Sequence, residues 1–180
     1  MSVFKKLNKL TIQAISNGHC GIFTAVDLAM MLNREDNKAF RTVLAKSVSN
    51  DTLKRISKSI YANAHLPPNP KGAIYKIAKR LRWKSFNYVS LESQLSYLGV
   101  ISQIPMSYLS VMTTGRSGTF TTDYGTIEFT HTNREISSLE DGVYFDDEIS
   151  MFRANEKRAI ADLKRVGRNM DMVEEVDNVG

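Results

Sequence analysis

The sequence predicts an α+β protein with a helical front part, followed by an antiparallel sheet with flanking helices. Three observations lead to this prediction. Apolar residues recur at helical spacing through most of the first 50 residues, and a short hairpin pattern follows them. Three stretches that read as short strands, separated by glycine-containing turns, occupy residues 107–131. Three prolines within residues 67–70 separate the two parts, because proline is excluded from helix interiors.

Length and composition narrow the class of protein. The chain has 180 residues, of which 42% are hydrophobic and 24% charged, values that are ordinary for a soluble globular protein. Its single cysteine, Cys20, excludes an internal disulfide. No apolar run approaches the ~18 residues of a membrane span, and the first residues lack the apolar segment of a signal peptide. We therefore expect a cytoplasmic protein that does not contact a membrane.

Two helices are expected first. Residues 2–17 are predicted to form a helix that ends at Asn17-Gly18, a good stop signal. Thr24 can cap the next helix, because its hydroxyl can accept a hydrogen bond from an amide of the first turn. The apolar side of that second helix is expected to consist of Val26, Leu28, Ala29 and Leu32.

A third helix and a hairpin follow the polar break at residues 33–36. The apolar side of this helix is formed by Phe40, Val43, Leu44, Ser47 and Val48. Its opposite side carries Lys38, Thr42, Ala45, Lys46 and Ser49, with Arg41 at the flank. The segment LKRISKSIYA has apolar residues at Leu53, Ile56 and Ile60. This pattern predicts a small hairpin from which Lys54, Arg55 and Lys58 project. This pattern is typical of a winged helix-turn-helix, which presents one helix to the major groove of DNA and the hairpin, or wing, to the flanking backbone.

The charge distribution supports a nucleic-acid partner. Residues 1–82 hold 15 Lys and Arg against 4 Asp and Glu, a net charge of +11. Residues 83–180 hold 9 against 15, a net charge of −6. Such an asymmetry suggests a module that faces nucleic acid, joined to a second part with another task. The alternative is a generic helical domain with a solvated basic face, and it stays open at this point.

The residues expected to bind double-stranded DNA come from the third helix and the hairpin. Lys38, Arg41, Thr42 and Lys46 would enter the major groove, and Lys54, Arg55 and Lys58 would touch phosphates or the minor groove. Arg41 is the candidate for a bidentate contact to guanine. RNA fits less well, because the nearby Phe40 and Tyr61 are expected to be buried and to leave no stacking surface.

Three parts are expected along the chain: a DNA-binding domain over 1–66, an α+β domain over 71–168 and a disordered tail over 169–180. Residues 71–84 are predicted to form a helix with Ile74, Ile77, Ala78 and Leu81 on its apolar face. A short strand near 86–89 and a helix from Ser90 to Gly99 come next. The strands at 107–113, 119–122 and 126–131 are expected to form an antiparallel meander, and residues 149–167 a final helix.

No cofactor, metal or catalytic site is expected. His19 and Cys20 are adjacent, but a zinc site needs a larger set of ligands and no group nearby would orient the histidine for catalysis. The turn at 115–118 lacks the Lys-Ser/Thr of a phosphate-binding loop. Asp146, Asp147 and Glu148 have no recognisable ligand spacing and are expected to be a solvated cluster at a helix start. A metal-dependent nuclease or nucleotidyltransferase that uses these three residues is the enzyme alternative.

Two stretches resemble the AbiEi-type antitoxins of bacterial toxin–antitoxin and phage-defence loci. The first is the hairpin TLKRISKSIYAN with the prolines after it, in which Leu53, Lys54, Arg55, Lys58 and Tyr61 match the family pattern. The second is QLSYLGVISQIPMSYLSVMTTGRSGTFTTDYGTIEFTHT, with Gln103, Ile104, Pro105, Arg116 and His131 at the matching steps. Together they cover about residues 5–135. The chain departs from the family at Ser59, where a glycine is common, and at VLAKSVSN, which lacks an arginine of the family's recognition helix.

The resemblance implies a transcriptional autorepressor that binds inverted repeats in its operator. A palindromic operator would bind two heads per site, supplied by a homodimer or by monomers that pair on DNA. The resemblance also implies a C-terminal domain that neutralises a cognate nucleotidyltransferase-like toxin without requiring a stable complex with it. The alternative is an ordinary winged-helix transcription regulator, in which the second domain serves dimerisation or ligand sensing.

Overall fold

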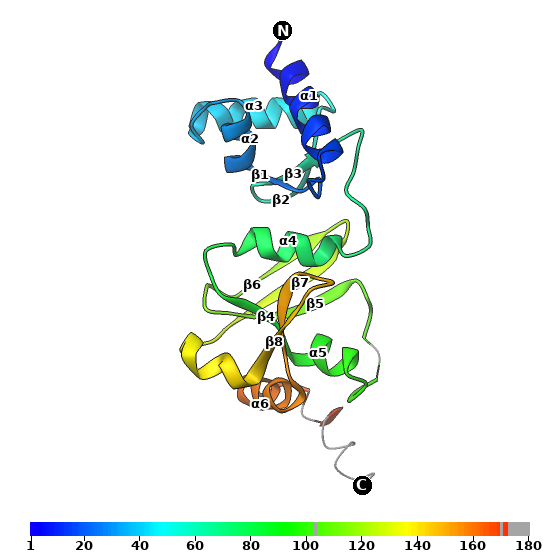
Figure 1. The fold of residues 1–180 in the computed structure, drawn as a ribbon, viewed down its shortest axis with the longest axis vertical. Coiled ribbons are helices and arrows are strands. Elements are labelled where there is room, and N and C mark those ends of the chain that lie inside the picture. The colour runs from blue at the N-terminus through cyan, green and yellow to red at the C-terminus, as the bar shows by residue number, and fades with distance from the viewer. Residues whose placement is uncertain (103, 170, 173–180) are drawn as a thin grey trace. The chain divides into compact units, whose positions relative to one another are not determined.

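A computed structural model describes residues 1–102, 104–169 and 171–172 of the chain. It shows a mixed α+β protein with two separate sheets, so the expected fold class is confirmed at this level (Figure 1). The chain divides into two units, Met1–Leu81 and Arg82–Gly180. The division falls after the fourth helix and not at the prolines, so that helix counts with the first unit. Each unit is described by itself.

The first unit contains helices around a small sheet. Its elements in chain order are α1 (Val3–Ser16), β1 (Phe23–Thr24), α2 (Ala25–Met31), α3 (Lys38–Ser49), β2 (Leu53–Ser57), β3 (Ile60–Asn63) and α4 (Ala73–Leu81). The strands lie in the order β1-β3-β2, and both pairings are antiparallel. The expected hairpin is therefore present as β2 and β3. The short strand β1 was not predicted, because two residues are too few to show a period.

Local capping sets where these helices begin. Thr24 accepts a hydrogen bond from the Asp27 amide at 3.0 Å, and the Asp27 carboxylate accepts from the Thr24 amide at 2.7 Å. This reciprocal capping box confirms the predicted cap at Thr24. Asn37 caps α3 by accepting from the Phe40 amide at 3.0 Å. This cap sets where α3 begins.

The core of the first unit is formed by apolar residues of the three helices and the hairpin. Its fully buried members include Leu7, Phe23, Leu28, Phe40, Leu44 and Leu53. The prediction was wrong for Val26, which is 46% exposed. Successive helical residues are about 100° apart, so Val26 lies about 200° from Leu28 and cannot share its face.

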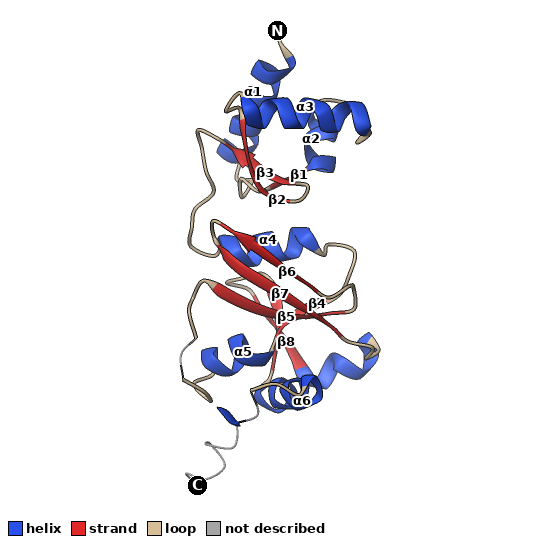
Figure 2. Ribbon diagram, turned by 180° about the vertical axis from the view of Figure 1, so that it is seen from behind, coloured by secondary structure: helices blue, strands red, loops and turns tan. Residues whose placement is uncertain are grey.

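The second unit is built on one mixed sheet. Its elements are β4 (Asn87–Val89), α5 (Leu91–Tyr97), β5 (Tyr108–Thr113), β6 (Gly118–Thr122), β7 (Gly125–His131), the 3-10 helix η1 (Ile136–Gly142), β8 (Val143–Asp146), β9 (Met151–Ala154) and α6 (Glu156–Val166). The six strands lie in the order β6-β7-β5-β4-β9-β8. Helices α5 and α6 pack together against one face of the sheet, where Leu91, Leu95 and Leu163 meet Tyr88 and Met112 (Figure 2).

The expected antiparallel meander was wrong. Strand β6 is antiparallel to β7, but β5 pairs with β7 in parallel, from Tyr108–Thr126 to Thr113–His131. Strand β7 therefore lies between β5 and β6, and the 115–118 turn does not join two paired strands. Alternating polarity identifies each strand and its faces, but it carries no information about the order of strands in a sheet.

The expected helix over 149–167 was wrong in its first turns. Residues 151–154 form β9, paired with β8 from Val143–Ala154 to Asp146–Met151. The helix begins only after Asn155, which caps it by accepting from the Arg158 amide at 2.9 Å. Asp147 and Glu148 thus lie in a hairpin turn and not at a helix start. Most of the tail predicted at 169–180 lies outside the described residues.

Within the described ranges, no helix combines the length and the apolar character that crossing a bilayer requires.

Candidate nucleic-acid interface

The exposed face of α3 carries the side chains expected to read DNA. Phe40, Leu44 and Ser47 are buried and fix the helix against the core. Val43 and Val48 are half-buried, and the exposed residues of the helix are Lys38, Ala39, Arg41, Thr42, Ala45, Lys46 and Ser49. The burial of the opposite face therefore leaves a mostly polar surface with three cations.

The β2–β3 hairpin presents the second group of cations. Leu53, Ile56 and Ile60 are buried at 1%, 8% and 2% exposure, which orients the intervening side chains outward. Lys54, Arg55 and Lys58 are exposed. Strand β3 is buried at all four positions, and Asn63 at its end donates to Thr11 of α1 at 2.8 Å. The hairpin is thus anchored through β3 and exposes its basic strand and turn.

A groove of about 380 Å³ lies between α3 and the hairpin. It is lined by Arg41, Ala45, Val48, Arg55, Lys58, Ser59 and Tyr61. Three of the seven residues predicted from the sequence line this groove: Arg41, Arg55 and Lys58. Lys46 lies on α3 next to the lining residue Ala45. Lys38 and Thr42 lie on the same helix, nearer to its start, and Lys54 lies on the same strand as Arg55.

Arg41 connects the helix to the tip of the hairpin. Its Nε and Nη2 donate to the two carboxylate oxygens of Asp36, just before α3. Its Nη1 donates to Oγ of Ser59 at 2.6 Å. The guanidinium, whose side chain is 41% exposed, is therefore held in one orientation at the mouth of the groove. Sequence reasoning missed Asp36 and Ser59, because neither stands at a helical spacing from Arg41.

Ser59 occupies the left-handed region of backbone conformation, with φ +63°. This conformation favours glycine, the residue that the resemblance leads one to expect at this step. A serine keeps the turn and adds a hydroxyl, which accepts the bond from Arg41. Its carbonyl accepts from the Ala25 amide of α2 at 3.0 Å. The tip of the hairpin is thus tied to two helices at once.

The acidic residues of the first unit offset only part of its positive charge. Asp27 serves the cap of α2 and an ion pair with Arg80 at 3.0 Å, and Asp36 is paired with Arg41. The other two, Glu35 and Asp51, are exposed. A surface with this excess of Lys and Arg attracts polyanions.

His19 and Cys20 belong to the packing of the first unit. The His19 ring stacks on Phe23 with centroids 4.4 Å apart, and its Nδ1 accepts from the Gly21 amide at 3.1 Å. Burial and the neighbouring Arg80 lower the pKa of His19. In the part of the chain that the structure describes, no three His, Cys, Asp or Glu side chains gather as a metal site would require.

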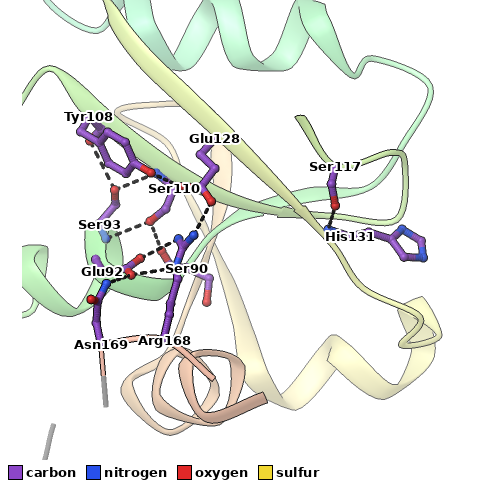
Figure 3. Close-up of polar contacts among 10 residues, drawn as sticks. All are labelled: Ser90, Glu92, Ser93, Tyr108, Ser110, Ser117, Glu128, His131, Arg168 and Asn169. Atoms are coloured by element: carbon purple, nitrogen blue, oxygen red, sulfur yellow. Dashed lines mark hydrogen bonds and ion pairs between the residues drawn. The ribbon is translucent and has the colours of Figure 1, made fainter. Parts of the chain in front are cut away.

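A separate polar cluster lies in the second unit, between α5, β7 and the end of α6 (Figure 3). Arg168 donates to both oxygens of Glu92, at 2.9 and 3.0 Å, and to Glu128, which also accepts from Tyr108. Burial acts to lower the pKa of Arg168, but the hydrogen bonds to Glu128 and Glu92 have the larger combined effect and raise this pKa. Asn169 completes the cluster by donating to Glu92 at 2.7 Å. Arg168 binds both carboxylates and offsets one of their two negative charges, so the cluster fastens the end of α6 to the sheet.

Asp162 and Tyr88 form a second internal network. The Asp162 carboxylate is fully buried and accepts from Tyr88 at 3.0 Å and from Ser90 at 2.8 Å. Burial raises the pKa of Asp162, against the effect of these hydrogen bonds. Burial and the nearby Asp162 likewise raise the pKa of the Tyr88 hydroxyl. Sequence reasoning missed this pair, since its members are 74 positions apart.

The chain has no match among models of protein families or among curated proteins.

The three acidic residues of the enzyme alternative do not gather as a metal site would require within the described part of the chain. Asp146 lies at the end of β8 and binds the guanidinium of Arg153 at 2.6 Å. This hydrogen bond lowers the pKa of Asp146, although burial opposes it. Asp147 and Glu148 are exposed in the turn that follows. Asp146 thus serves the β8–β9 hairpin as the partner of a buried cation.

Proposed function

We propose that the first unit is a winged helix-turn-helix domain that binds double-stranded DNA, and that the chain is a transcriptional autorepressor. The observation that carries the proposal is the basic groove between α3 and the β2–β3 hairpin. A helix preceded by a second helix and a tight turn is the arrangement that places its exposed face in the major groove. A hairpin beside it can follow the phosphates.

The proposed contacts divide by chemistry. Lys38, Thr42 and Lys46 lie on the exposed face of α3 and would meet base edges or the groove walls. Arg41, already oriented by Ser59, would exchange Asp36 for a guanine edge or a phosphate. Lys54, Arg55 and Lys58 on the hairpin would meet phosphates, which give affinity without sequence preference.

A binding titration with the duplex upstream of the chain's own gene tests this proposal. Lys58→Ala is expected to weaken binding to all duplexes alike and to reduce the salt slope by about one. Arg41→Lys keeps the charge but loses the fork of two donors, and it is expected to lose about 1–3 kcal/mol of discrimination at one base pair. The matched control is Lys9→Ala, which removes a cation from α1. If all three variants bind like the parent, the interface lies elsewhere.

The antitoxin role is part of the same proposal and derives from the resemblance of residues 94–132 to the antitoxin family. The second unit would carry it, and no catalytic step by this chain is involved. Co-expression with the product of the neighbouring gene provides the test. Rescue of growth from a toxic neighbour is the expected result, and a neighbour without toxicity would leave a DNA-binding regulator whose second unit serves dimerisation or ligand sensing.

A further inference from the structure

Strand β8 forms one edge of the six-stranded sheet. Among the described strands it pairs with β9 alone, in a continuous register from Val143–Ala154 to Asp146–Met151. The backbone N–H and C=O groups along the outer side of an edge strand have no strand partner. The outer side of β8 can therefore accept one more strand.

The side chains of β8 do not protect this edge. Tyr144 is 41% exposed and Phe145 is 52% exposed, and consecutive residues of a strand point to opposite faces. Proline, lysine and bulges are common guards of an edge, and the Val143–Asp146 segment contains none of these. Its one charged residue, Asp146, is bound to Arg153 of β9. A strand added here would find an aromatic ring on each face of the sheet.

The ring of Tyr144, on one of these faces, is held by a buried polar network. Arg153, only 3% exposed, lies with its guanidinium 3.9 Å from the centroid of the Tyr97 ring and donates to Gln94 at 3.1 Å. Gln94 in turn donates to the hydroxyl of Tyr144 at 3.2 Å. Tyr97 is 60% exposed. Tyr97 and Tyr144 are thus fixed before any partner arrives, which lowers the entropy cost of binding.

Acidic residues stand at both ends of the strand. Glu140 and Asp141 come before β8, and Asp147 and Glu148 follow it, and all four are exposed. If two copies paired antiparallel through β8, Glu140 and Asp141 of one copy would lie beside Asp147 and Glu148 of the other. Residues 83–180 as a whole carry a net charge of −6, which adds to this repulsion. Charge complementarity therefore favours a basic partner over a second copy.

We propose that the β8 edge docks an extended segment of a partner protein as an added strand. The segment has alternating apolar residues in its centre and lysine or arginine at its ends. Backbone hydrogen bonds to β8 would supply affinity, and the aromatic rings and flanking acids would supply specificity. This surface is independent of the proposed DNA interface, so either proposal can fail alone.

The test uses the full chain and two synthetic ten-residue peptides, followed by NMR of the backbone amides. Both peptides have an alternating valine–threonine core, one with two lysines at each end and the other with two glutamates. The lysine peptide is expected to shift the amides of β8 and to bind at least about tenfold more tightly than the glutamate peptide at low salt. Equal binding of the two peptides, or shifts centred on another element, would overturn the proposal.

Two variants and a control locate the site. Phe145→Lys should reduce the affinity for the lysine peptide by about tenfold or more, because it adds a repelling charge and removes an apolar contact. Phe145→Thr keeps a residue that suits a strand and should reduce it less, which provides a second variant should the first fail to fold. Thr121→Lys places the same charge on the exposed opposite edge, β6, and should leave binding intact. If only Thr121→Lys lost binding, the assignment to β8 would be wrong. It would also be wrong if the free chain formed a dimer that Phe145→Lys dissociates, since a second copy would then occupy the edge.

Discussion

The guanidinium of Arg41 in α3 donates a hydrogen bond to the hydroxyl of Ser59 at the tip of the β2–β3 hairpin, at 2.6 Å. This bond joins the helix proposed to enter the major groove to the hairpin proposed to follow the phosphates. The Ser59 carbonyl is bound in turn by the Ala25 amide. Helix and hairpin are therefore joined by residues of the proposed interface itself, and substitutions there should affect both stability and binding.

Ser59 gives the first prediction. The left-handed φ of +63° costs a serine about 1 kcal/mol relative to glycine, and the hydrogen bond from Arg41 offsets part of that cost. Ser59→Ala keeps the strain and loses the bond, so it should destabilise the hairpin by about 1 kcal/mol. Ser59→Gly relieves the strain while losing the bond and should stay within about 0.5 kcal/mol of the parent. Amide hydrogen exchange of β2 and β3 in the full chain measures the stability change of both Ser59 variants, with Ser57→Ala as the control. Equal losses in the two Ser59 variants would show that strain plays no part.

Asp36 gives the second prediction. Its carboxylate occupies two donors of Arg41 that a guanine or a phosphate would need. Asp36→Asn should release the guanidinium and raise the affinity for duplex DNA by about threefold to tenfold at low salt. Glu35→Gln removes the same charge one position away and should give a smaller increase. A loss of affinity in Asp36→Asn would mean instead that Asp36 positions Arg41 for its contact with DNA.

Features set by neighbouring residues could be predicted from the sequence. The cap at Thr24 depends on Asp27 three positions later, and the hairpin from Leu53 to Asn63 depends on one short turn. The exposed face of α3 followed from helical spacing alone. Each of these is decided within a few residues, where the physical rules of capping and period act directly.

Features set by distant pairing could not be predicted in this way. Strand β5 lies beside β7 and not beside β6, because the order of strands depends on how the whole sheet assembles. The apolar residues Met151 and Phe152 fitted a helix as well as a strand, and only pairing with β8 decides between them. The partners of Arg41 were missed for a related reason, since Asp36 precedes the helix and Ser59 is 18 positions away.

Asp162 gives a prediction about pH. Burial raises its folded-state pKa above the ordinary value of 3.8, so the folded chain holds this proton more tightly than the unfolded chain does. The contribution of Asp162 to stability is therefore largest below pH 3.8 and is lost as the pH rises through the raised pKa. Asp162→Asn should flatten this dependence and make the second unit more stable than the parent at pH 7. Chemical unfolding at pH 4 and pH 7 tests it, with the exposed Asp147→Asn as the control. A variant that is less stable than the parent at pH 7 would show that Arg134, 3.8 Å away, compensates the buried charge.

Arg168 gives the last prediction, which depends on the two carboxylates that it binds. Arg168→Ala leaves Glu92 and Glu128 close together without their cation, and Glu92 is only 5% exposed. The loss should be about 2 kcal/mol at pH 7, below the ~3–5 kcal/mol of a fully buried pair because Arg168 itself is 31% exposed. Arg168→Lys should recover only part of it, since an ammonium cannot bind both carboxylates through a planar fork. Because protonation removes the repulsion, the deficit of Arg168→Ala should shrink as the pH falls toward 4. Arg165→Ala on the exposed side of α6 should show neither effect, whereas a deficit in Arg168→Ala that does not change with pH would indicate lost packing and not unbalanced charge.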